Sequence, residues 1–343
     1  MSDKVLVTGG AGFIGHALIE FFIENTDFEI ISLDRLDYSG NLNRISNMLE
    51  SYGESDKKRI QIVHHDLKAE INRLVSNNIE DVKHIFHLAA SSHVDRSIEN
   101  PLSFVMDNVV ATCNLLNFSR SIDNLESFFY FSTDEVFGPA NKGVKYKEWD
   151  RYNSTNPYSA SKAGAEELAV SFQNTYGLPI IITHCMNVFG NRQHPEKYIP
   201  NTISKIIKGE KVFIHSDKDR NPGSRHYIHS NDVSSAVMHI LEKHNNLQDS
   251  KFDKFGATCL KVNIASDLEL NNYEVADIIS KKLNKKFEYE FIDVPSSRPG
   301  HDLRYALDNS VLNSLGWKAQ KSDVEGIESV VDWYLENSNW LNY

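Results

Sequence analysis

The sequence predicts an α/β protein built on a doubly wound parallel sheet, with a smaller α/β domain attached. Three observations support this prediction: strands alternate with helices over the first 185 residues, a glycine cluster joins the first strand to the first helix, and a less regular, proline-punctuated region follows. Strands that alternate with helices favour βαβ units and therefore a parallel sheet. The length of 343 residues suits a core domain plus a smaller one.

The expected elements follow one another in simple alternation. The predicted strands are Val5–Thr8, Phe28–Leu33, Ile60–His64, Val82–Leu88, Phe128–Ser132 and Pro179–Cys185. The predicted helices are Phe13–Asn25, Pro101–Arg120 and Pro157–Tyr176. We expect the core domain to comprise residues 1–185 and 226–260, and the smaller domain to comprise residues 186–225 and 261–343.

Composition excludes several classes of protein. Hydrophobic residues make up 41% of the chain, which is enough for a sizeable core. The net charge of −11 lacks the basic footprint of a nucleic-acid-binding protein. The sequence contains no apolar run of 18 residues, so we expect no membrane span.

Cysteine usage indicates a reducing compartment. The three cysteines, Cys113, Cys185 and Cys259, form no CxxC pair, and any disulfide would leave one unpaired. The first residues run directly into a strand and a glycine cluster rather than into a secretory leader. We therefore expect a cytoplasmic protein.

The glycine cluster Gly9–Gly15 is typical of a dinucleotide-binding site of the Rossmann type. The motif GGAGFIG follows a strand and opens a helix, which is the context that such a motif requires. Its glycines permit the tight turn, the approach of backbone to a pyrophosphate and close helix–strand packing, while the helix N-terminus attracts phosphate. The core domain is therefore expected to bind a dinucleotide.

Acidic residues after the second and third strands indicate how the adenosine half would be held. Asp34 lies 19 residues beyond Gly15, where a carboxylate can accept hydrogen bonds from the ribose hydroxyls. Asp66 could reach the adenine. Asp34 favours NAD, whereas the adjacent Arg35 leaves NADP open. The expected cofactor-binding residues are Gly9, Gly12, Phe13, Ile14, Gly15, Asp34, Arg35, Asp66, Leu67, Tyr158 and Lys162.

Two further motifs indicate catalysis. Tyr158 and Lys162 lie four residues apart on a predicted helix, so both side chains share one face, and the ammonium would lower the pKa of the phenol. Thr133, Asp134 and Glu135 follow a strand, at the edge of the sheet where functional groups gather. Two neighbouring carboxylates can serve as an acid and a base. We therefore expect Thr133, Asp134, Glu135, Tyr158 and Lys162 to be catalytic.

These motifs together give the chain a recognisable family likeness. The chain resembles the extended short-chain dehydrogenase/reductases, and most closely their dTDP-glucose 4,6-dehydratase branch. The stretches that carry the resemblance are TGGAGFIG at 8–15, HLAASSHVDRSI at 87–98, STDEVFG at 132–138, NPYSASKAGAEEL at 156–168, HPEKYIP at 194–200 and RPGHDLRYALD at 298–308.

The resemblance implies a lyase that uses NAD or NADP and converts a dTDP- or UDP-linked gluco-configured hexose to its 4-keto-6-deoxy derivative. In that reaction Tyr158 would take the proton of the C4 hydroxyl as hydride passes to the cofactor. Glu135 would remove the C5 proton, Asp134 would protonate the departing C6 hydroxyl, and the hydride would return to C6. Such an enzyme belongs to deoxysugar biosynthesis.

The resemblance also implies a set of substrate contacts. Arg225 and Arg298 could clamp the diphosphate, because a guanidinium pairs bidentately with phosphate. The expected substrate-binding residues are His93, Arg96, Asn187, Glu196, Lys197, Arg225, Arg298 and His301. Histidine spacing indicates no metal site. Ser91 departs from the family, whose bacterial members usually carry Glu there, and we expect it near the sugar-nucleotide pocket.

Three alternative functions remain open on sequence alone. They are a UDP-N-acetylglucosamine 4,6-dehydratase that inverts C5, a nucleotide-sugar 4-epimerase, and a non-catalytic dinucleotide-sensing scaffold. A 4-epimerase needs the Tyr/Lys site but not the Asp–Glu pair, so the product mass separates epimerisation from dehydration. A scaffold would turn over no nucleotide sugar.

An apolar helix face predicts self-association. The side chains that share this face at helical spacing are Leu102, Val105, Met106, Val109, Cys113 and Leu116, with Leu168 and Phe172 on the helix of Tyr158. Family relatives pair these two helices across a two-fold axis. We therefore expect a homodimer with a four-helix interface.

Overall fold

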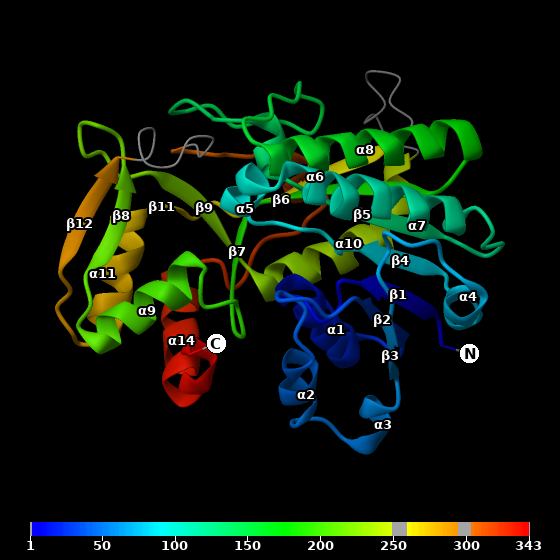
Figure 1. Ribbon diagram of the computed structural model, residues 1–343, viewed down its shortest axis with the longest axis horizontal. Coiled ribbons are helices and arrows are strands. Elements are labelled where there is room, and N and C mark those ends of the chain that lie inside the picture. Colours follow the sequence, from blue (N-terminus) through cyan, green and yellow to red (C-terminus); the bar gives the residue numbers. More distant parts are fainter. Residues whose placement is uncertain (1, 249–258, 294–302, 343) are drawn as a thin grey trace.

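The computed structural model describes residues 2–248, 259–293 and 303–342 (Figure 1). Its strands are β1 (Lys4–Thr8), β2 (Glu29–Asp34), β3 (Ile60–His64), β4 (His84–His87), β5 (Ser127–Thr133), β6 (Ile180–Cys185), β7 (Asn187–Phe189), β8 (Val212–Ser216), β9 (Ser224–His229), β10 (Leu260–Ile264), β11 (Glu269–Asn271) and β12 (Tyr289–Asp293). Each predicted strand is present, with ends displaced by a residue or two.

The α-helices are α1 (Phe13–Asn25), α2 (Asn43–Leu49), α3 (Glu54–Lys57), α4 (Arg73–Ile79), α5 (Val94–Glu99), α6 (Pro101–Phe104), α7 (Ala111–Ser119), α8 (Pro157–Tyr176), α9 (Tyr198–Lys208), α10 (Ser230–Gln248), α11 (Asn272–Lys282), α13 (Ser310–Ser314) and α14 (Val324–Glu336). A π-helix, η1 (Val105–Val110), joins α6 to α7. Two 3-10 helices, η2 (Asp134–Phe137) and η3 (Ser338–Leu341), complete the described elements.

The core of the fold, among the described residues, is a seven-stranded sheet in the order β10-β6-β5-β4-β1-β2-β3. All neighbouring strands in it are parallel. The chain winds outward from β1 to β3 in one direction and from β4 to β6 in the other, so the sheet is doubly wound. In such sheets ligands bind beyond the carboxyl ends of the strands, at the point between β1 and β4 where the winding reverses. The predicted Rossmann-type fold class is confirmed.

Helices cover both faces of this sheet (Figure 1). On one face Phe22 of α1 and Ile240 of α10 share a buried cluster with sheet residues. On the other face Leu115 of α7 and Ala165 of α8 belong to a second cluster. Burial of these apolar faces holds α8, the helix of Tyr158, against the strand that ends in Thr133.

The smaller part of the molecule packs around a separate core. Its described strands form two sheets, β11-β9-β7 and β12-β8. Helices α9, α11 and α14 contribute Ile203, Ile279 and Val331 to the same buried cluster. Strand β10 belongs to the large sheet, so the predicted boundary after residue 260 falls inside a strand.

The segment predicted as one helix from Pro101 to Arg120 contains the π-helix η1 in its middle. A π turn inserts an extra residue, which rotates the side chains that follow relative to regular α-helical spacing. Here Asn108 is buried, and so is Leu116, which we predicted on the outer face. Leu102, Val105 and Met106 do remain exposed. No helix in the described ranges is long and apolar enough to cross a membrane.

Candidate active site

The glycine loop after β1 is shaped to receive a phosphate group. Gly9 has φ +70°, and a Cβ there would lie 2.8 Å from the backbone nitrogen of Ala89. A Cβ on Gly15 would lie 2.2 Å from the carbonyl oxygen of Gly9. Helix α1 begins at Phe13. Its N-cap, Gly12, has no side chain that could accept hydrogen bonds from the first N–H groups of the helix, which include those of Phe13 and Ile14. These N–H groups can therefore donate hydrogen bonds to an anion such as phosphate.

A cavity of about 90 Å³ lies between this loop and the ends of β2, β3 and β4. Its lining includes Gly9, Gly12, Leu33, Asp34, Arg35, Asp37, His65, Asp66, Leu67, Ser91 and Asp107. The Nε2 atom of His65 is buried there without a hydrogen-bond partner among the described residues. Polar lining, a glycine cradle and an unsatisfied buried nitrogen fit the adenosine half of a dinucleotide.

The predicted cofactor residues take different parts in this cavity. Asp34 is buried and accepts hydrogen bonds from the backbone of Ala11 at 3.1 Å and of Leu36 at 2.8 Å. Its carboxylate therefore also fixes the loop. Asp66 also lines the cavity and lies 3.3 Å from the ammonium of Lys68. Ser91, expected near the sugar-nucleotide pocket, lines this cavity and donates a 2.6 Å hydrogen bond to Asp107.

The predicted catalytic residues meet at the carboxyl end of β5. Thr133 ends that strand, and Asp134 and Glu135 begin the 3-10 helix η2. Tyr158 and Lys162 lie on the first turns of α8, and both are buried. Thr133 hydrogen-bonds to Tyr158 and donates to Asp134 at 3.1 Å. The structure thus brings these five residues together at one edge of the sheet.

Asn156 links these two elements, and sequence reasoning missed it. Its side-chain oxygen caps α8 by accepting from the backbone of Ser159, and its amide nitrogen donates to Glu135 Oε2 at 3.1 Å. The N-cap therefore orients the Glu135 carboxylate relative to Tyr158. An Asn before a Pro at the start of a helix is a recognisable capping signal. Its second hydrogen bond depends on tertiary structure.

Burial and nearby charge shift the pKa values of Asp134 and Tyr158. Desolvation, and secondarily the charge of Glu135, raises the pKa of Asp134 to about 7. Its Oδ2 atom is buried without a hydrogen-bond partner among the described residues. Asp134 is therefore partly protonated at neutral pH and can donate a proton. Burial, first, and the charge of Glu135 also raise the pKa of Tyr158. A positive charge bound beside the phenol would lower this pKa and prepare Tyr158 to act as a base.

Lys162 differs from the sequence-based expectation. Its ammonium donates a 2.6 Å hydrogen bond to the carbonyl oxygen of Phe131, and burial lowers its pKa to about 7. The pKa of Tyr158 is not lowered in this arrangement, because burial, first, and the charge of Glu135 raise it. Lys162 also lies 4.3 Å from the ring centroid of Tyr130.

A buried ionic network supports α8 behind these residues. Glu166, one turn beyond Lys162, accepts hydrogen bonds from Ser132 at 2.7 Å and from Lys261 at 2.9 Å. It also contacts Tyr152 and lies 3.1 Å from His184. Although burial alone would raise the Glu166 pKa, His184 and Lys261 hold it well below its ordinary value. The network connects α8, the helix of Tyr158, to β5, β6 and β10.

The predicted substrate residues form two groups. Arg96 lies 3.1 Å from Glu196 and stacks over the ring of Tyr38 at 3.7 Å. His93 lies 3.7 Å from the same carboxylate, and its Nδ1 atom is buried without a partner among the described residues. Lys197 is the N-cap of α9, on the segment that carries Glu196. Arg96 and His93 of the α5 segment thus meet Glu196, which lies just before α9.

Two further predicted substrate residues, Arg225 and Asn187, lie on the neighbouring strands β9 and β7. Arg225 donates to the carbonyl oxygens of Ser224 and Leu303, and its positive charge lowers the pKa of Asp134. Its guanidinium is therefore anchored by the backbone, and its charge partly offsets the rise in the Asp134 pKa. Asn187 begins β7 and pairs with Tyr227. Arg298 and His301 lie outside the described residues.

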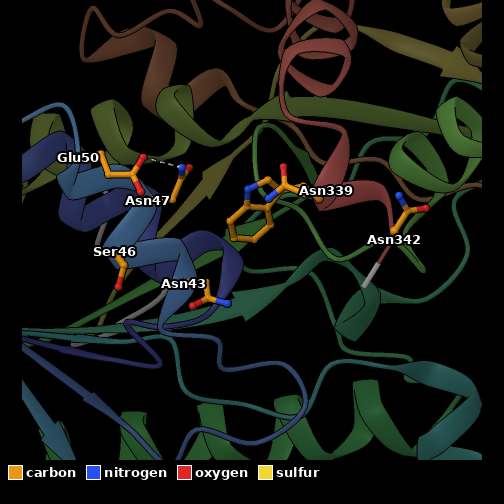
Figure 2. A pocket seen from close by; sticks show the side chains of 7 residues that line it. Asn43, Ser46, Asn47, Glu50, Asn339 and Asn342 are labelled. Atoms are coloured by element: carbon orange, nitrogen blue, oxygen red, sulfur yellow. Dashed lines mark hydrogen bonds between the residues drawn. The ribbon is translucent and has the colours of Figure 1, made fainter.

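A larger hollow, of about 420 Å³, lies elsewhere on the molecule. Figure 2 shows Asn43, Ser46 and Asn47 of α2 and its C-cap Glu50 on one side of it, with Asn339 and Asn342 of the C-terminal segment on the other. None of its lining residues belongs to the predicted site, and amides dominate its surface. It offers no acid–base pair, so the chemistry is assigned to the β5 edge. The described residues also contain no group of three or more His, Cys, Asp or Glu side chains suited to a metal.

Comparison with known proteins places this arrangement in a family. The family model described as GDP-mannose 4,6 dehydratase matches residues 6–330. The chain is 35% identical to dTDP-glucose 4,6-dehydratase of Salmonella typhimurium, over 99% of this chain and 94% of the relative. It is 36% identical to the low-salt glycan biosynthesis protein Agl12 of Haloferax volcanii, over 96% and 98%.

A solved structure extends the similarity to three dimensions. DesIV, a dTDP-glucose 4,6-dehydratase from Streptomyces venezuelae crystallised with NAD and TYD bound, aligns with a TM-score of 0.84 and 32% identity. The alignment covers 98% of each chain. The family resemblance predicted from the sequence motifs is confirmed.

Proposed function

We infer the activity of this enzyme from one premise: the chain belongs to the family described as GDP-mannose 4,6 dehydratase. It is a nucleotide-sugar 4,6-dehydratase, a lyase of the short-chain dehydrogenase/reductase type, and its cofactor is NAD. Within that class we propose dTDP-glucose as the substrate, because relatives that match along their whole length bear that name. A UDP-linked sugar is the alternative.

The residues of the glycine loop and the cavity fit the cofactor. Gly9, Gly12 and Gly15 provide the close backbone approach, and the N–H groups of Phe13 and Ile14 would hold the pyrophosphate. Asp34 would receive the ribose hydroxyls beside the cavity. Bound NAD would supply an oxidant that accepts hydride from C4 of the sugar and returns it to C6. The proton transfers of the reaction would be carried out by the protein's own side chains.

The observation that carries the assignment is the buried Asp134 beside Glu135 and Tyr158. Tyr158 would remove the proton of the C4 hydroxyl, with Thr133 hydrogen-bonded to it. Glu135, oriented by Asn156, would remove the C5 proton, and Asp134 would donate a proton to the departing C6 hydroxyl. Loss of the hydroxyl as water needs an acid and a base in one place. A 4-epimerase does not need this pair.

The substrate contacts follow from the same arrangement. Arg225, anchored near Asp134, is proposed to bind the diphosphate, with Arg298 as its partner. We propose that His93, Arg96, Asn187, Glu196, Lys197 and His301 contact the nucleotide sugar. The two-domain division then has a function, because the sugar nucleotide would lie between the large sheet and the smaller sheets.

Isotope labelling tests this function directly. With dTDP-glucose deuterated at C4, the enzyme should release a product one water lighter that carries the deuterium at C6, without stoichiometric accumulation of NADH. NMR of the product would show the D configuration at C5 if Glu135 returns its proton to the face from which it came.

A product of unchanged mass would indicate a 4-epimerase, and an L configuration would indicate an inverting dehydratase. Turnover of UDP-N-acetylglucosamine alone would reassign the substrate, and no turnover across a nucleotide-sugar panel would favour a scaffold.

We also propose a homodimer. Leu102 of α6 is 68% exposed, and Val105 and Met106 of η1 are 42% and 38% exposed, so one face of this segment presents apolar side chains to solvent. A second copy related by a two-fold axis would cover this face. Light scattering at micromolar concentration should give twice the mass of the chain. Leu102→Asp should yield monomers, whereas Leu74→Asp, at a site 81% exposed on α4, should leave the dimer intact. A monomeric wild-type chain would contradict the proposal.

We propose the cytoplasm as the compartment of this enzyme. Cys113, Cys185 and Cys259 are all free thiols. Free thiols are typical of a reducing environment.

A further inference from the structure

Arg35 is the residue that leaves the choice of dinucleotide open in the sequence, and the structure gives it two acidic partners. Its Nη1 and Nη2 atoms donate to the two carboxylate oxygens of Asp107 at 2.6 and 2.9 Å. Its Nε and Nη2 atoms donate to Asp37 Oδ2 at 2.8 and 2.6 Å. A guanidinium has five N–H donors, so this arrangement uses most of its capacity. The carboxylate of Asp66 lies 4.0 Å from Nη1 and is a third acidic neighbour of this guanidinium.

The π-helix η1 is what brings Asp107 to this position. It carries Asp107 and the buried Asn108 next to each other. Asn108 accepts from the backbone nitrogen of Ser91 at 2.8 Å and donates to Ser161 of α8 at 2.8 Å. The Ser91 hydroxyl in turn donates to Asp107 at 2.6 Å. Asp107 is therefore fixed from both sides, and its side chain is only 9% exposed.

The charges around the cavity disfavour a further anion. The four carboxylates of Asp34, Asp37, Asp66 and Asp107 all line it. They face two cations, Arg35 and Lys68, so the formal charge of this cluster is −2. A phosphate monoester at neutral pH carries about −1.5 to −2 charges itself. It would meet repulsion, and it could recruit Arg35 only by displacing two short, charge-assisted pairs.

We propose that Asp107 and Asp37 are specificity-determining residues, which neutralise Arg35 so that the site accepts a dinucleotide with a free ribose 2′-hydroxyl and rejects one with a 2′-phosphate. This proposal rests on the proposed function, because it concerns how the NAD site selects its ligand. The selectivity for NAD over NADP would then depend on the pairing of Arg35 with Asp37 and Asp107 as well as on Asp34. Removal of both partners should turn Arg35 into a receptor for the 2′-phosphate.

Binding measurements on cofactor-free protein test this, with NAD and NADP as the probes in isothermal titration calorimetry. The wild-type chain should bind NAD at least about tenfold more tightly than NADP. The double variant Asp37→Asn with Asp107→Asn should bind NADP about tenfold to a hundredfold more tightly than the wild type, the worth of one hydrogen bond between charged groups. Its affinity for NAD should change by less than about threefold.

Three control proteins separate release of Arg35 from other effects. Asp123→Asn removes one carboxylate charge at an exposed site, as Asp37→Asn does, and should leave both affinities unchanged. Asp37→Asn alone keeps the Oδ1 atom that accepts from Ser39, so the loop survives, and it should give part of the gain even if the π-helix tolerates no change at position 107. Addition of Arg35→Ala to the double variant should abolish the gain.

The outcomes distinguish this proposal from the proposed function. Equal affinity of the wild-type chain for NAD and NADP, or an unchanged ratio in both Asp37→Asn and the double variant, would overturn the role of Asp37 and Asp107 while leaving the dehydratase assignment in place. A gain for NADP that persists in the Arg35→Ala protein would overturn the role of Arg35. Failure of the wild-type chain to bind either dinucleotide would overturn the proposed function, and this proposal with it.

Discussion

Glu135→Gln is expected to slow dehydration of the nucleotide sugar by about a hundredfold or more, the scale on which a positioned general base contributes. The substitution preserves the size of the side chain, and its amide oxygen can still accept from Asn156, which lies 3.1 Å from Glu135 Oε2. It removes the ability to take the C5 proton, together with the negative charge beside Asp134 and Tyr158. Oxidation at C4 uses Tyr158 instead, so a transient absorbance of NADH should survive. Stopped-flow absorbance and product analysis by mass spectrometry measure both steps.

Two comparisons identify the cause of the slow step. Glu126→Gln changes an exposed glutamate at the opposite, amino-terminal end of β5 and should keep wild-type kinetics. Asn156→Ala should slow the same step less severely, because it leaves the base in place but removes its orienting hydrogen bond. Dehydration at the wild-type rate in Glu135→Gln would rule out Glu135 as the base. Loss of the transient NADH signal would place Glu135 in the oxidation step instead.

The parts of the site that sequence predicted are those whose chemistry is local. The glycine loop, the strand-end residues Thr133 and Asp134, and the i,i+4 pair of Tyr158 and Lys162 each depend on a few consecutive residues and on one element boundary. Their elements were predicted from the alternation of apolar strands and helices. Because the carboxyl ends of parallel strands share one edge of the sheet, the meeting of these residues followed from the fold class.

The parts that sequence missed depend on contacts between distant segments. Asn156 was visible as a helix cap, but its hydrogen bond to Glu135 joins two elements. The π-helix η1 was invisible, because an assumed period of 3.6 residues carries no signal for an inserted residue, and this hid the pairing of Asp107 with Arg35. The same assumption put Leu116 on the outer face, whereas it is buried in the core.

Lys162 shows a limit of another kind. The spacing of Tyr158 and Lys162 correctly placed both on the first turns of α8, yet spacing contains no information about desolvation. Both groups are buried, so the charged form of each is disfavoured, and the pKa of Lys162 falls to about 7. The ammonium of Lys162 donates its hydrogen bond to the carbonyl oxygen of Phe131, 2.6 Å away. Protonation states in such a site follow from burial, which only the folded structure supplies.

Asp134→Asn is expected to reduce kcat/KM by about a hundredfold or more, because an amide cannot donate the proton that the departing C6 hydroxyl needs. The raised pKa of Asp134 also determines how the wild-type rate should depend on pH. Its pKa is raised to about 7, first by burial and then by the charge of Glu135. The protonated form is the active acid, so kcat/KM should fall about tenfold per pH unit as the pH rises beyond about 7. The variant should lack this decline.

The stability of the same variant separates a catalytic from a structural loss. A carboxyl whose pKa rises on folding stabilises the protein fully below its ordinary pKa of 3.8, and this contribution is lost as the pH rises through about 7. The wild-type chain therefore buries an unfavourable charge at pH 8, and Asp134→Asn should melt at a higher temperature there. Glu135→Gln, which removes the neighbouring charge, should shift the alkaline decline in rate to lower pH. An Asp134→Asn protein that is both less stable at pH 8 and inactive would make Asp134 a structural residue, and one that retains the decline near pH 7 would assign that titration to another group.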